Sequence, residues 1–304
     1  MTDQGTPTPS GPAHIDGGGV TGRRQVLVGG AGLLAALGLS PHAEATVPTA
    51  SLPDAASAKT PHGSRGLLHR WATDTWHSLD AMTHPATGLP ADNIRESLAA
   101  GDRSGYTSPT NIGGYLWSTI VARELGIITA KECTARLTRT LTTLGSMEHH
   151  APSGMFFNWY DEATGDTLRI WPEDGKPVEP FVSSVDNGWL GAALLVVKNA
   201  GGAAAPLAAV LFERMRWDSF YDAGEIPGHS GVRPGGLMHG GFYPFADGRP
   251  GETFLGTHID GGDVWLTTHH YDTIVSETRI TSYLGILTGQ VPGHHYYAPW
   301  RTFP

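Results

Sequence analysis

Hydrophobic and polar residues alternate with a helical period in six stretches of the chain. Apolar side chains recur there three or four positions apart, so that each stretch forms one buried face of an α-helix. In chain order the stretches cover residues 67–79, 108–126, 129–144, 183–199, 203–217 and 276–289. The pattern predicts six helices.

Local signals mark where several of these helices begin. Ser108 precedes Pro109, which favours a helix start, and Thr129 with Glu132 has the spacing of a capping box. Ser183 and Ser276 are expected to cap the fourth and sixth helices, which would place Glu277 in the first turn of the sixth.

Short connections predict that the helices form antiparallel hairpins. Only a few residues separate the second helix from the third and the fourth from the fifth. We therefore expect an all-α fold of helical hairpins with long Gly/Pro-rich loops, and such hairpins can close into an (α/α) toroid. A full ring needs about twelve helices, so we expect it to be incomplete at the C-terminus. Residues 218–274 are rich in glycine and proline and are expected to be a functional loop or to hold short strands.

Composition narrows the class of protein. Charged residues make up 16%, with 41 glycines and 22 prolines, which favours long structured loops. The net charge is −9 and no basic cluster lies outside the N-terminal segment, so nucleic acid is not an expected partner. The single cysteine, Cys133, lies on the apolar face of the third helix, where burial is expected.

The N-terminal segment has the features of a twin-arginine signal peptide. Arg23 and Arg24 precede the apolar run 26–39, and a small-residue cleavage triplet follows at 43–45. The run is shorter than the roughly 20 residues that span a bilayer. We expect a signal peptide over residues 1–45, a flexible linker over 46–65 and the folded domain over 66–304. The expected destination is extracytoplasmic, through the twin-arginine export machinery, with an uncleaved anchor as the alternative.

Three polar residues occupy the same position relative to three predicted helices. Asn111, Asp186 and Glu277 each continue a buried stripe towards the N-terminal end of a helix, so they can converge at one mouth of the bundle. Asp161 follows an aromatic cluster just before the fourth helix. Paired carboxylates in different environments can act as general acid and base in glycoside hydrolysis. The alternative is that these acids only stabilise helix ends and that Asp161 only forms a turn.

Aromatic and basic side chains near these acids suggest a sugar site. Trp159, Tyr160 and Trp265 can stack on sugar rings, and Arg279 can orient a carboxylate or bind a hydroxyl. The alternative for Arg279 is a surface ion pair.

Histidines raise the question of a metal. Histidine pairs occur at 149–150, 269–270 and 294–295, and His258, Asp260 and Asp263 lie close together in a glycine-rich stretch. No known metal-binding motif accompanies them. We therefore expect neither a metal nor another cofactor.

Four segments resemble the bacterial glycoamylase-like family, which includes endo-β-1,2-glucanases and a domain of cyclic β-1,2-glucan synthases. They are residues 107–113, 157–161, 183–188 and 276–283. The resemblance implies an (α/α) toroid that hydrolyses a β-glucan-like polysaccharide with two acids and no required metal. It implies Glu277 as a catalytic carboxylate, which we expect to be the general acid, and Asp186 or Asp161 as its partner or as a substrate ligand. We also expect Asn111, Asn158 and Asn187 to be among the substrate-binding residues.

Two other functions fit the same pattern. A non-catalytic glycan-binding or cell-envelope protein would use the same scaffold and would act, like the enzyme, as a monomer. A polysaccharide lyase would need cations to neutralise a uronate, and the acidic chain with few lysines and arginines near the acids argues against it.

Overall fold

The computed structural model describes residues 62–224, 236–245, 253–257, 262–271 and 276–298. The expected signal peptide and most of the expected linker lie outside these ranges. The first helix begins at His62, a few residues before the expected start of the folded domain near Gly66.

Six α-helices are present within the described ranges, as the hydrophobic pattern predicts. They are α1 (His62–Met82), α2 (Pro109–Glu124), α3 (Ala130–Ser146), α4 (Ser184–Ala200), α5 (Ala205–Glu213) and α6 (Arg279–Leu287). The side chains of Ser108, Thr129 and Ser183 cap α2, α3 and α4 by accepting hydrogen bonds from backbone N–H groups three residues later. These three predicted helix starts are confirmed.

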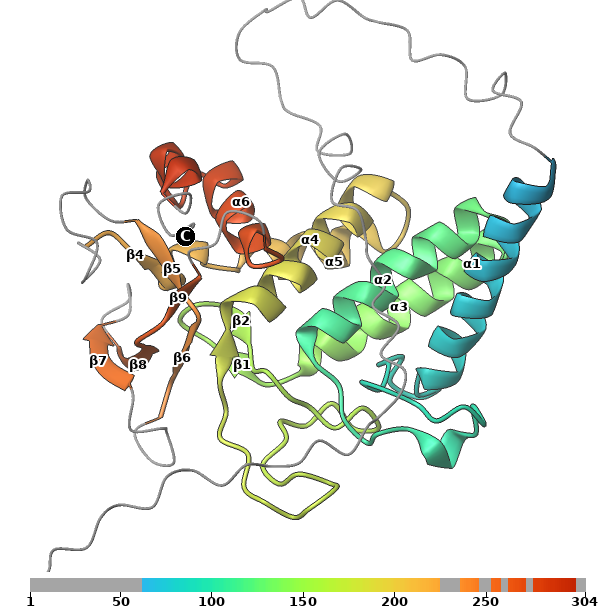
Figure 1. Cartoon of the computed structure of the whole chain (residues 1–304), viewed down its shortest axis with the longest axis horizontal. Helices are drawn as coiled ribbons and strands as arrows, with labels where there is room; N and C mark the ends of the chain where they lie inside the picture. The colour runs from blue at the N-terminus through green and yellow to red at the C-terminus, as the bar shows by residue number, and fades with distance from the viewer. Residues whose placement is uncertain (1–61, 225–235, 246–252, 258–261, 272–275, 299–304) are drawn as a thin grey trace, which may run out of the picture. The chain divides into compact units, whose positions relative to one another are not determined.

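The even-numbered helices pack against one another in sequence. α4 lies between α2 and α6, while α1 and α3 pack on α2, and α5 packs on α4 and α3 (Figure 1). The buried face of α3 consists of the residues that its pattern predicts, which are Cys133, Leu137, Thr140, Leu141 and Leu144. Alternate helices therefore form an inner row, which is the arrangement that a series of helical hairpins produces. No closed ring forms among the described residues.

Glycines set the close spacing of this inner row. A Cβ atom on Gly113 of α2 would lie 2.9 Å from the carbonyl oxygen of Trp189 on α4. A Cβ atom on Gly188 of α4 would lie 2.4 Å from Thr281 Oγ1 on α6. Both distances are too short for a side chain, so the backbones of α2, α4 and α6 approach each other only because these positions have none.

The fold also contains three small antiparallel sheets, so the all-α prediction is only partly right. The first sheet pairs β1 (His149–His150) with β2 (Met155–Phe156). The second has the order β3 (Val182–Ser183), β6 (Gly241–Tyr243), β8 (Asp263–Thr267) and β7 (Thr253–Thr257). The third has the order β4 (Tyr221–Asp222), β5 (Leu237–His239) and β9 (His270–Tyr271). Most of these strands fall in the Gly/Pro-rich stretch, where short strands were one of the two expectations.

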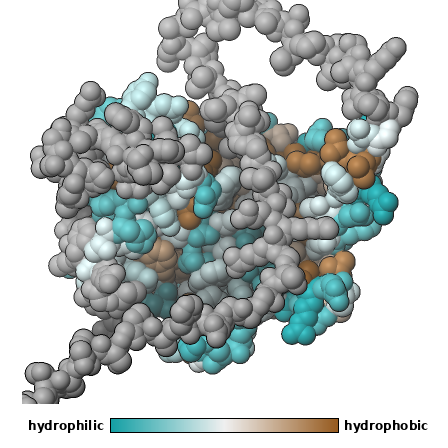
Figure 2. Space-filling view, in the orientation of Figure 1, coloured by the Kyte–Doolittle hydropathy of each residue, from teal (hydrophilic) through white to brown (hydrophobic). Residues whose placement is uncertain are grey.

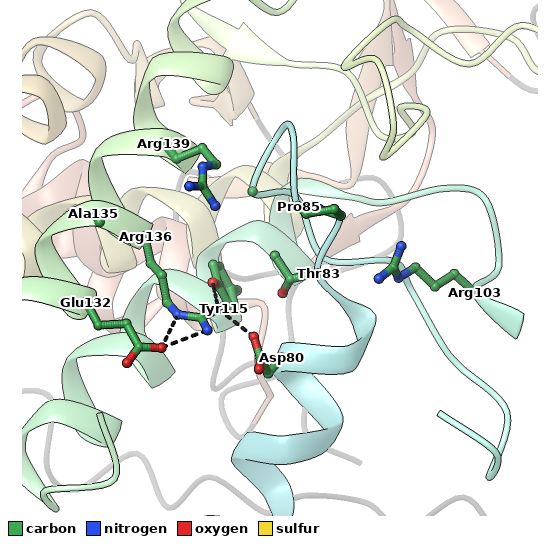
Figure 3. A pocket seen from close by; sticks show the side chains of 10 residues that line it. Asp80, Thr83, Pro85, Arg103, Tyr115, Glu132, Ala135, Arg136 and Arg139 are labelled. Atoms are coloured by element: carbon green, nitrogen blue, oxygen red, sulfur yellow. Dashed lines mark hydrogen bonds and ion pairs between the residues drawn. The ribbon is translucent and has the colours of Figure 1, made fainter. Parts of the chain in front are cut away.

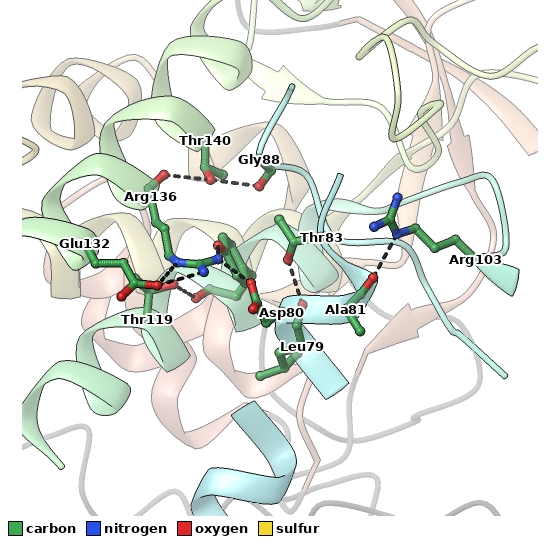
Figure 4. A network of polar contacts seen from close by, with 11 residues as sticks. Leu79, Asp80, Ala81, Thr83, Gly88, Arg103, Thr119, Glu132, Arg136 and Thr140 are labelled. Carbon is green, nitrogen blue, oxygen red and sulfur yellow. Dashed lines mark hydrogen bonds and ion pairs between the residues drawn. The ribbon is translucent and has the colours of Figure 1, made fainter. Parts of the chain in front are cut away.

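A polar network joins the first three helices. Arg136 of α3 contacts Asp80 of α1 at 2.5 Å and Glu132 at 2.8 Å, and it donates to the Tyr115 hydroxyl of α2 (Figure 4). Its guanidinium also lies over the ring of Trp76, which stacks on Tyr115. The network fixes α1 against the α2–α3 hairpin.

The visible surface is mostly hydrophilic or neutral, with small hydrophobic patches (Figure 2). The first half of α1 contributes exposed apolar side chains, among them Leu68 and Trp71. Across the part of the chain that is described, every helix is too short or too polar to cross a membrane.

Candidate active site

Backbone pairing brings three distant segments together at the start of α4. Thr107, just before α2, exchanges two backbone hydrogen bonds with Tyr160, at 2.8 and 3.0 Å. The N–H of Asn158 donates to the carbonyl of Phe181 at 2.7 Å. The N-terminal end of α2, the 157–161 segment and the N-terminal end of α4 therefore meet at one place.

Asp186 lies at this junction, in the first turn of α4. Its Oδ1 accepts a hydrogen bond from Thr110 Oγ1 at 2.6 Å. With the Asn158 amide oriented to satisfy both of its groups, the amide nitrogen donates to Asp186 Oδ2 at 2.7 Å. Each carboxylate oxygen thus has one side-chain donor, and the half-buried carboxylate has a fixed orientation. Thr110 was not among the predicted site residues.

We call Asp186, Thr110 and Asn158 the Asp186 cluster. Asn111, which follows Thr110 in α2, extends this cluster away from Asp186. Its amide nitrogen donates to Asp92 Oδ1 at 2.9 Å, and its backbone N–H donates to the capping hydroxyl of Ser108. Asp92 lies in the loop before α2 and was not among the predicted site residues. The Asn111 side chain therefore orients a further carboxylate beside the α2 end of the cluster.

An aromatic wall adjoins Asp186. We give this name to Tyr106, Trp159 and Trp171, whose ring centroids are 5.1 to 5.4 Å apart in edge-to-face contacts. Trp159 Nε1 donates to the Asn158 amide oxygen at 2.9 Å, which connects the wall to the Asp186 cluster. Trp159 and Trp171 are partly exposed, so their faces are open to a ligand. Of the three, only Trp159 was predicted.

Tyr271 interacts electrostatically with both Asp186 and Glu277. Burial raises the pKa of the Tyr271 hydroxyl, and the negative charges of Asp186 and Glu277 raise it further. Both carboxylates therefore lie close enough to act on the same hydroxyl group. Tyr271 was not among the predicted site residues.

Glu277 lies before α6, not in its first turn. The helix begins at Arg279 after Thr278, and Thr278 makes no side-chain capping bond, so the predicted Ser276 cap is wrong. The Ser276 hydroxyl instead donates to Glu277 Oε2 at 3.2 Å. The Glu277 side chain is exposed, which leaves its carboxyl group accessible to a ligand.

Two predicted substrate-binding residues are structural. Tyr160 is fully buried, and its hydroxyl accepts from the N–H of Phe157 and donates to the carbonyl of Glu148, both at 2.7 Å. Asn187 is also fully buried; its amide bonds to the N–H and the carbonyl of Phe156 and to the Ser183 carbonyl. Neither side chain can reach a sugar, because each is enclosed with its polar atoms satisfied.

Two other candidates, Asp161 and Arg279, are occupied by local contacts. Asp161 Oδ1 accepts hydrogen bonds from the N–H groups of Ala163 and Thr164. Asp161 therefore forms a turn, which was the alternative to its role as a catalytic acid. Arg279 is buried between the rings of Tyr283 and Tyr296 and donates to the Tyr296 carbonyl at 3.1 Å, so it is not a surface ion pair. Within the described chain, its Nε and Nη1 have no hydrogen-bond partner.

Trp265 lies on β8, opposite Tyr243, and is partly exposed. Of the three residues that were considered for a metal site and not expected to bind one, His258 and Asp260 lie outside the described residues, while Asp263 begins β8 and is exposed.

A separate pocket of about 420 Å³ lies among α1, α2 and α3 (Figure 3). Its two acids, Asp80 and Glu132, both bind the guanidinium of Arg136. Because these carboxylates are held in ion pairs, they are poor candidates for acid–base chemistry. The pocket shares no residue with the Asp186 cluster.

Comparison with known proteins agrees with the resemblance read from the sequence. Residues 70–229 match a family described as "Protein of unknown function (DUF3131)". The cyclic β-(1,2)-glucan synthase NdvB of Rhizobium meliloti (strain 1021) is 36% identical over 136 residues, which are 43% of this chain and 4% of the synthase.

A solved glucanase structure shows the same type of fold. The β-1,2-glucanase of Parabacteroides distasonis superposes with a TM-score of 0.52 at 15% identity, over 77% of this chain and 29% of the glucanase. The endo-β-1,2-glucanase of Talaromyces funiculosus gives a TM-score of 0.49 at 12% identity, over 76% of this chain and 49% of that enzyme. The predicted resemblance is confirmed, and the chain spans less than half the length of each of these proteins.

Proposed function

The chain belongs to the DUF3131 family, and we propose that it is a glycoside hydrolase of a β-glucan-like polysaccharide. The observation that carries the proposal is the carboxylate of Asp186, which Thr110 and Asn158 orient beside the partly exposed rings of Trp159 and Trp171. Glu277 is an exposed acid on a different element, and the charges of both acids act on the Tyr271 hydroxyl, so we infer that the two supply the acid and the base that glycosidic cleavage requires.

The two acids differ in ways that suit different roles. Asp186 is oriented by Thr110 and Asn158 and lies at the N-terminal end of α4. We assign it as the general base that takes a proton from the attacking water. Glu277 is exposed, and among the described residues its carboxyl group bonds to Ser276, its neighbour in the chain, so this group is accessible to a glycosidic oxygen. We assign it as the general acid that protonates the leaving group.

The surroundings support a polysaccharide substrate. Trp159 and Trp171 provide partly exposed aromatic faces beside Asp186, and such faces stack on the apolar side of a sugar ring. The names of the related synthase and glucanase make β-1,2-linked glucose the first linkage to test. The inner row of α2, α4 and α6 supports an (α/α) toroid in which the starts of these helices face the substrate.

Export through the twin-arginine pathway is a separate part of the proposal. It rests on the arginine pair and the apolar run in residues 1–45. N-terminal sequencing of the protein recovered outside the cytoplasm tests it, with Arg23→Lys and Arg24→Lys together expected to retain the chain inside.

The experiment is incubation of the purified chain with linear β-1,2-, β-1,3- and β-1,4-glucans. New reducing ends and the anomeric configuration of the products would be followed. Glu277→Gln and Asp186→Asn are each expected to lower kcat by at least about 100-fold, because each removes one proton-transfer group. The matched controls are Glu213→Gln and Asp74→Asn, which change exposed acids on α5 and α1.

Full activity in Glu277→Gln would refute the assignment of the general acid. Binding of a glucan by the wild type without release of reducing ends would instead identify a non-catalytic glycan-binding protein.

A further inference from the structure

Each strand of the β4–β5–β9 sheet contributes one potential metal ligand. Asp222 lies on β4, His239 on β5 and His270 on β9. His239 is directly opposite His270, and Asp222 is opposite Leu237, two residues from His239. Side chains two residues apart on a strand point to the same face, so all three project from one face of the sheet.

The three ligand atoms converge. His270 Nε2 is 3.0 Å from Asp222 Oδ2, and His239 Nε2 is 3.8 Å from the same oxygen. All three atoms lie within 4.8 Å of one another. Ligands about 2.1 Å from a tetrahedral zinc ion lie about 3.4 Å apart, so small side-chain rotations are sufficient to surround an ion.

Outer contacts orient two of the ligands. His239 Nδ1 bonds to the Thr267 carbonyl at 3.0 Å, which places the N–H on Nδ1 and the lone pair on Nε2. Asp222 Oδ1 accepts from the Gly224 N–H at 2.8 Å, which directs Oδ2 towards the histidines. Such carbonyl and amide contacts are typical of the groups that hold metal ligands in place.

The cluster is partly enclosed by the protein. His239 is 3% exposed, and the residues Asp222 and His270 are half-buried beside it.

We propose that Asp222, His239 and His270 bind one divalent transition-metal ion, zinc in the first instance. Two imidazoles and one carboxylate suit zinc better than calcium or magnesium, which prefer oxygen ligands. The sequence paired His270 with His269, but the partners are on the neighbouring strands, so spacing along the chain could not reveal the site.

The site is distinct from the proposed acids but adjacent to them along β9. Tyr271 follows His270 and therefore points to the opposite face of the sheet. An ion that links β4, β5 and β9 would fix the strand that presents Tyr271 to Asp186 and Glu277. The inference does not depend on glycosidase activity.

The test is direct metal binding by the full chain after removal of metal with a chelator. Titration calorimetry with zinc is expected to show one ion per chain, and cobalt(II) is expected to give the absorption of a low-coordinate site. Asp222→Asn and His270→Gln should each weaken binding by at least about 100-fold, more than the loss of an outer contact costs. His77→Gln, at an exposed position of α1, is the matched control.

Circular dichroism of each variant separates loss of a ligand from loss of the fold. Zinc should also raise the Tm of the wild type and of His77→Gln but not of Asp222→Asn. Absence of stoichiometric binding to the folded wild type would overturn the proposal and leave the Asp222–His270 contact as an ordinary ion pair. Unchanged binding in both ligand variants would overturn it as well.

Discussion

Thr281 of α6 donates a hydrogen bond from its hydroxyl to the backbone carbonyl of Ser184, the first residue of α4, at 2.6 Å. Both residues are buried. The bond ties the segment that carries Glu277 to the segment that carries Asp186. It therefore sets the relative position of the two proposed acids more directly than any contact of the acids themselves.

Thr281→Val removes this bond while keeping the shape of the side chain. We expect it to lower the free energy of unfolding by about 1–3 kcal/mol, because the Ser184 carbonyl is left without that donor in a buried place. Urea unfolding measures the change. Thr288→Val is the control, since Thr288 is exposed and bonds only to carbonyls of its own helix; an equal loss in both variants would contradict the expectation.

Two neighbouring glycines of α2 should respond in opposite ways to alanine. Gly113→Ala places a methyl group against the backbone of α4 and is expected to destabilise the protein by about 1–3 kcal/mol. Gly114 faces open space, so Gly114→Ala is expected to stabilise it by about 0.5–1 kcal/mol. The Tm of each variant, measured by thermal unfolding, tests both expectations. A higher Tm for Gly113→Ala than for the wild type would show that α2 and α4 are less closely packed than the structure indicates.

Asn187→Ala should be strongly destabilising although Asn187 neighbours a proposed catalytic acid. The substitution removes three hydrogen bonds and leaves the Phe156 backbone groups unpaired, at a cost of about 2–4 kcal/mol. Asn93→Ala, at an exposed position, provides the comparison in urea unfolding. If Asn187→Ala weakened glucan binding with no loss of stability, the original assignment to substrate binding would be restored.

Tyr271→Phe should separate catalysis from binding. The ring remains and the hydroxyl that interacts electrostatically with both acids is lost, so we expect kcat to fall by about 10- to 100-fold. KM and Tm should change little. The pH profile of kcat should also shift, because the hydroxyl acts on the carboxylates; a profile identical to that of the wild type would argue for a purely structural ring.

His295 should make the stability of the protein depend on pH. The side chain is fully buried, and burial lowers its pKa below the usual value. The folded protein therefore favours the neutral imidazole. The contribution of His295 to the free energy of unfolding is fully present above about pH 6.5 and is lost as the pH falls. His295→Gln is expected to reduce the difference in unfolding free energy between pH 7.5 and pH 5, with His77→Gln as control. An unchanged difference would show that His295 does not contribute.

Local interactions explain which parts of the fold were predictable. Capping residues such as Ser108 and Thr129 form hydrogen bonds within one helical turn. The buried face of α3 follows from the spacing of its apolar residues alone. The start of α6 was misplaced because Ser276 bonds to Glu277 and Thr278, while packing of Thr281 on α4 decides where the helix lies.

The candidate site was predictable where a single helix turn or one short segment, such as residues 157–161, supplied it. Asp186 follows from its place in the first turn of α4, but Asn187, one residue later, is rotated by about 100° and faces the core. Tyr106, Trp171 and Tyr271 join the site through contacts between distant segments, for which periodicity gives no signal. The density of aromatics before α4 was the one available hint for Trp171.

The first turn of α4 also has a consequence for how the chain folds. Its bonds to Phe156, Gly240, Thr110 and Thr281 join residues 31, 56, 76 and 97 positions apart. Closing loops of that length costs chain entropy before any contact is gained, and such non-local pairing slows folding. The carboxylates should thus come together late. On refolding from denaturant, helical circular dichroism should recover first, and glucan cleavage should return only in the slowest phase.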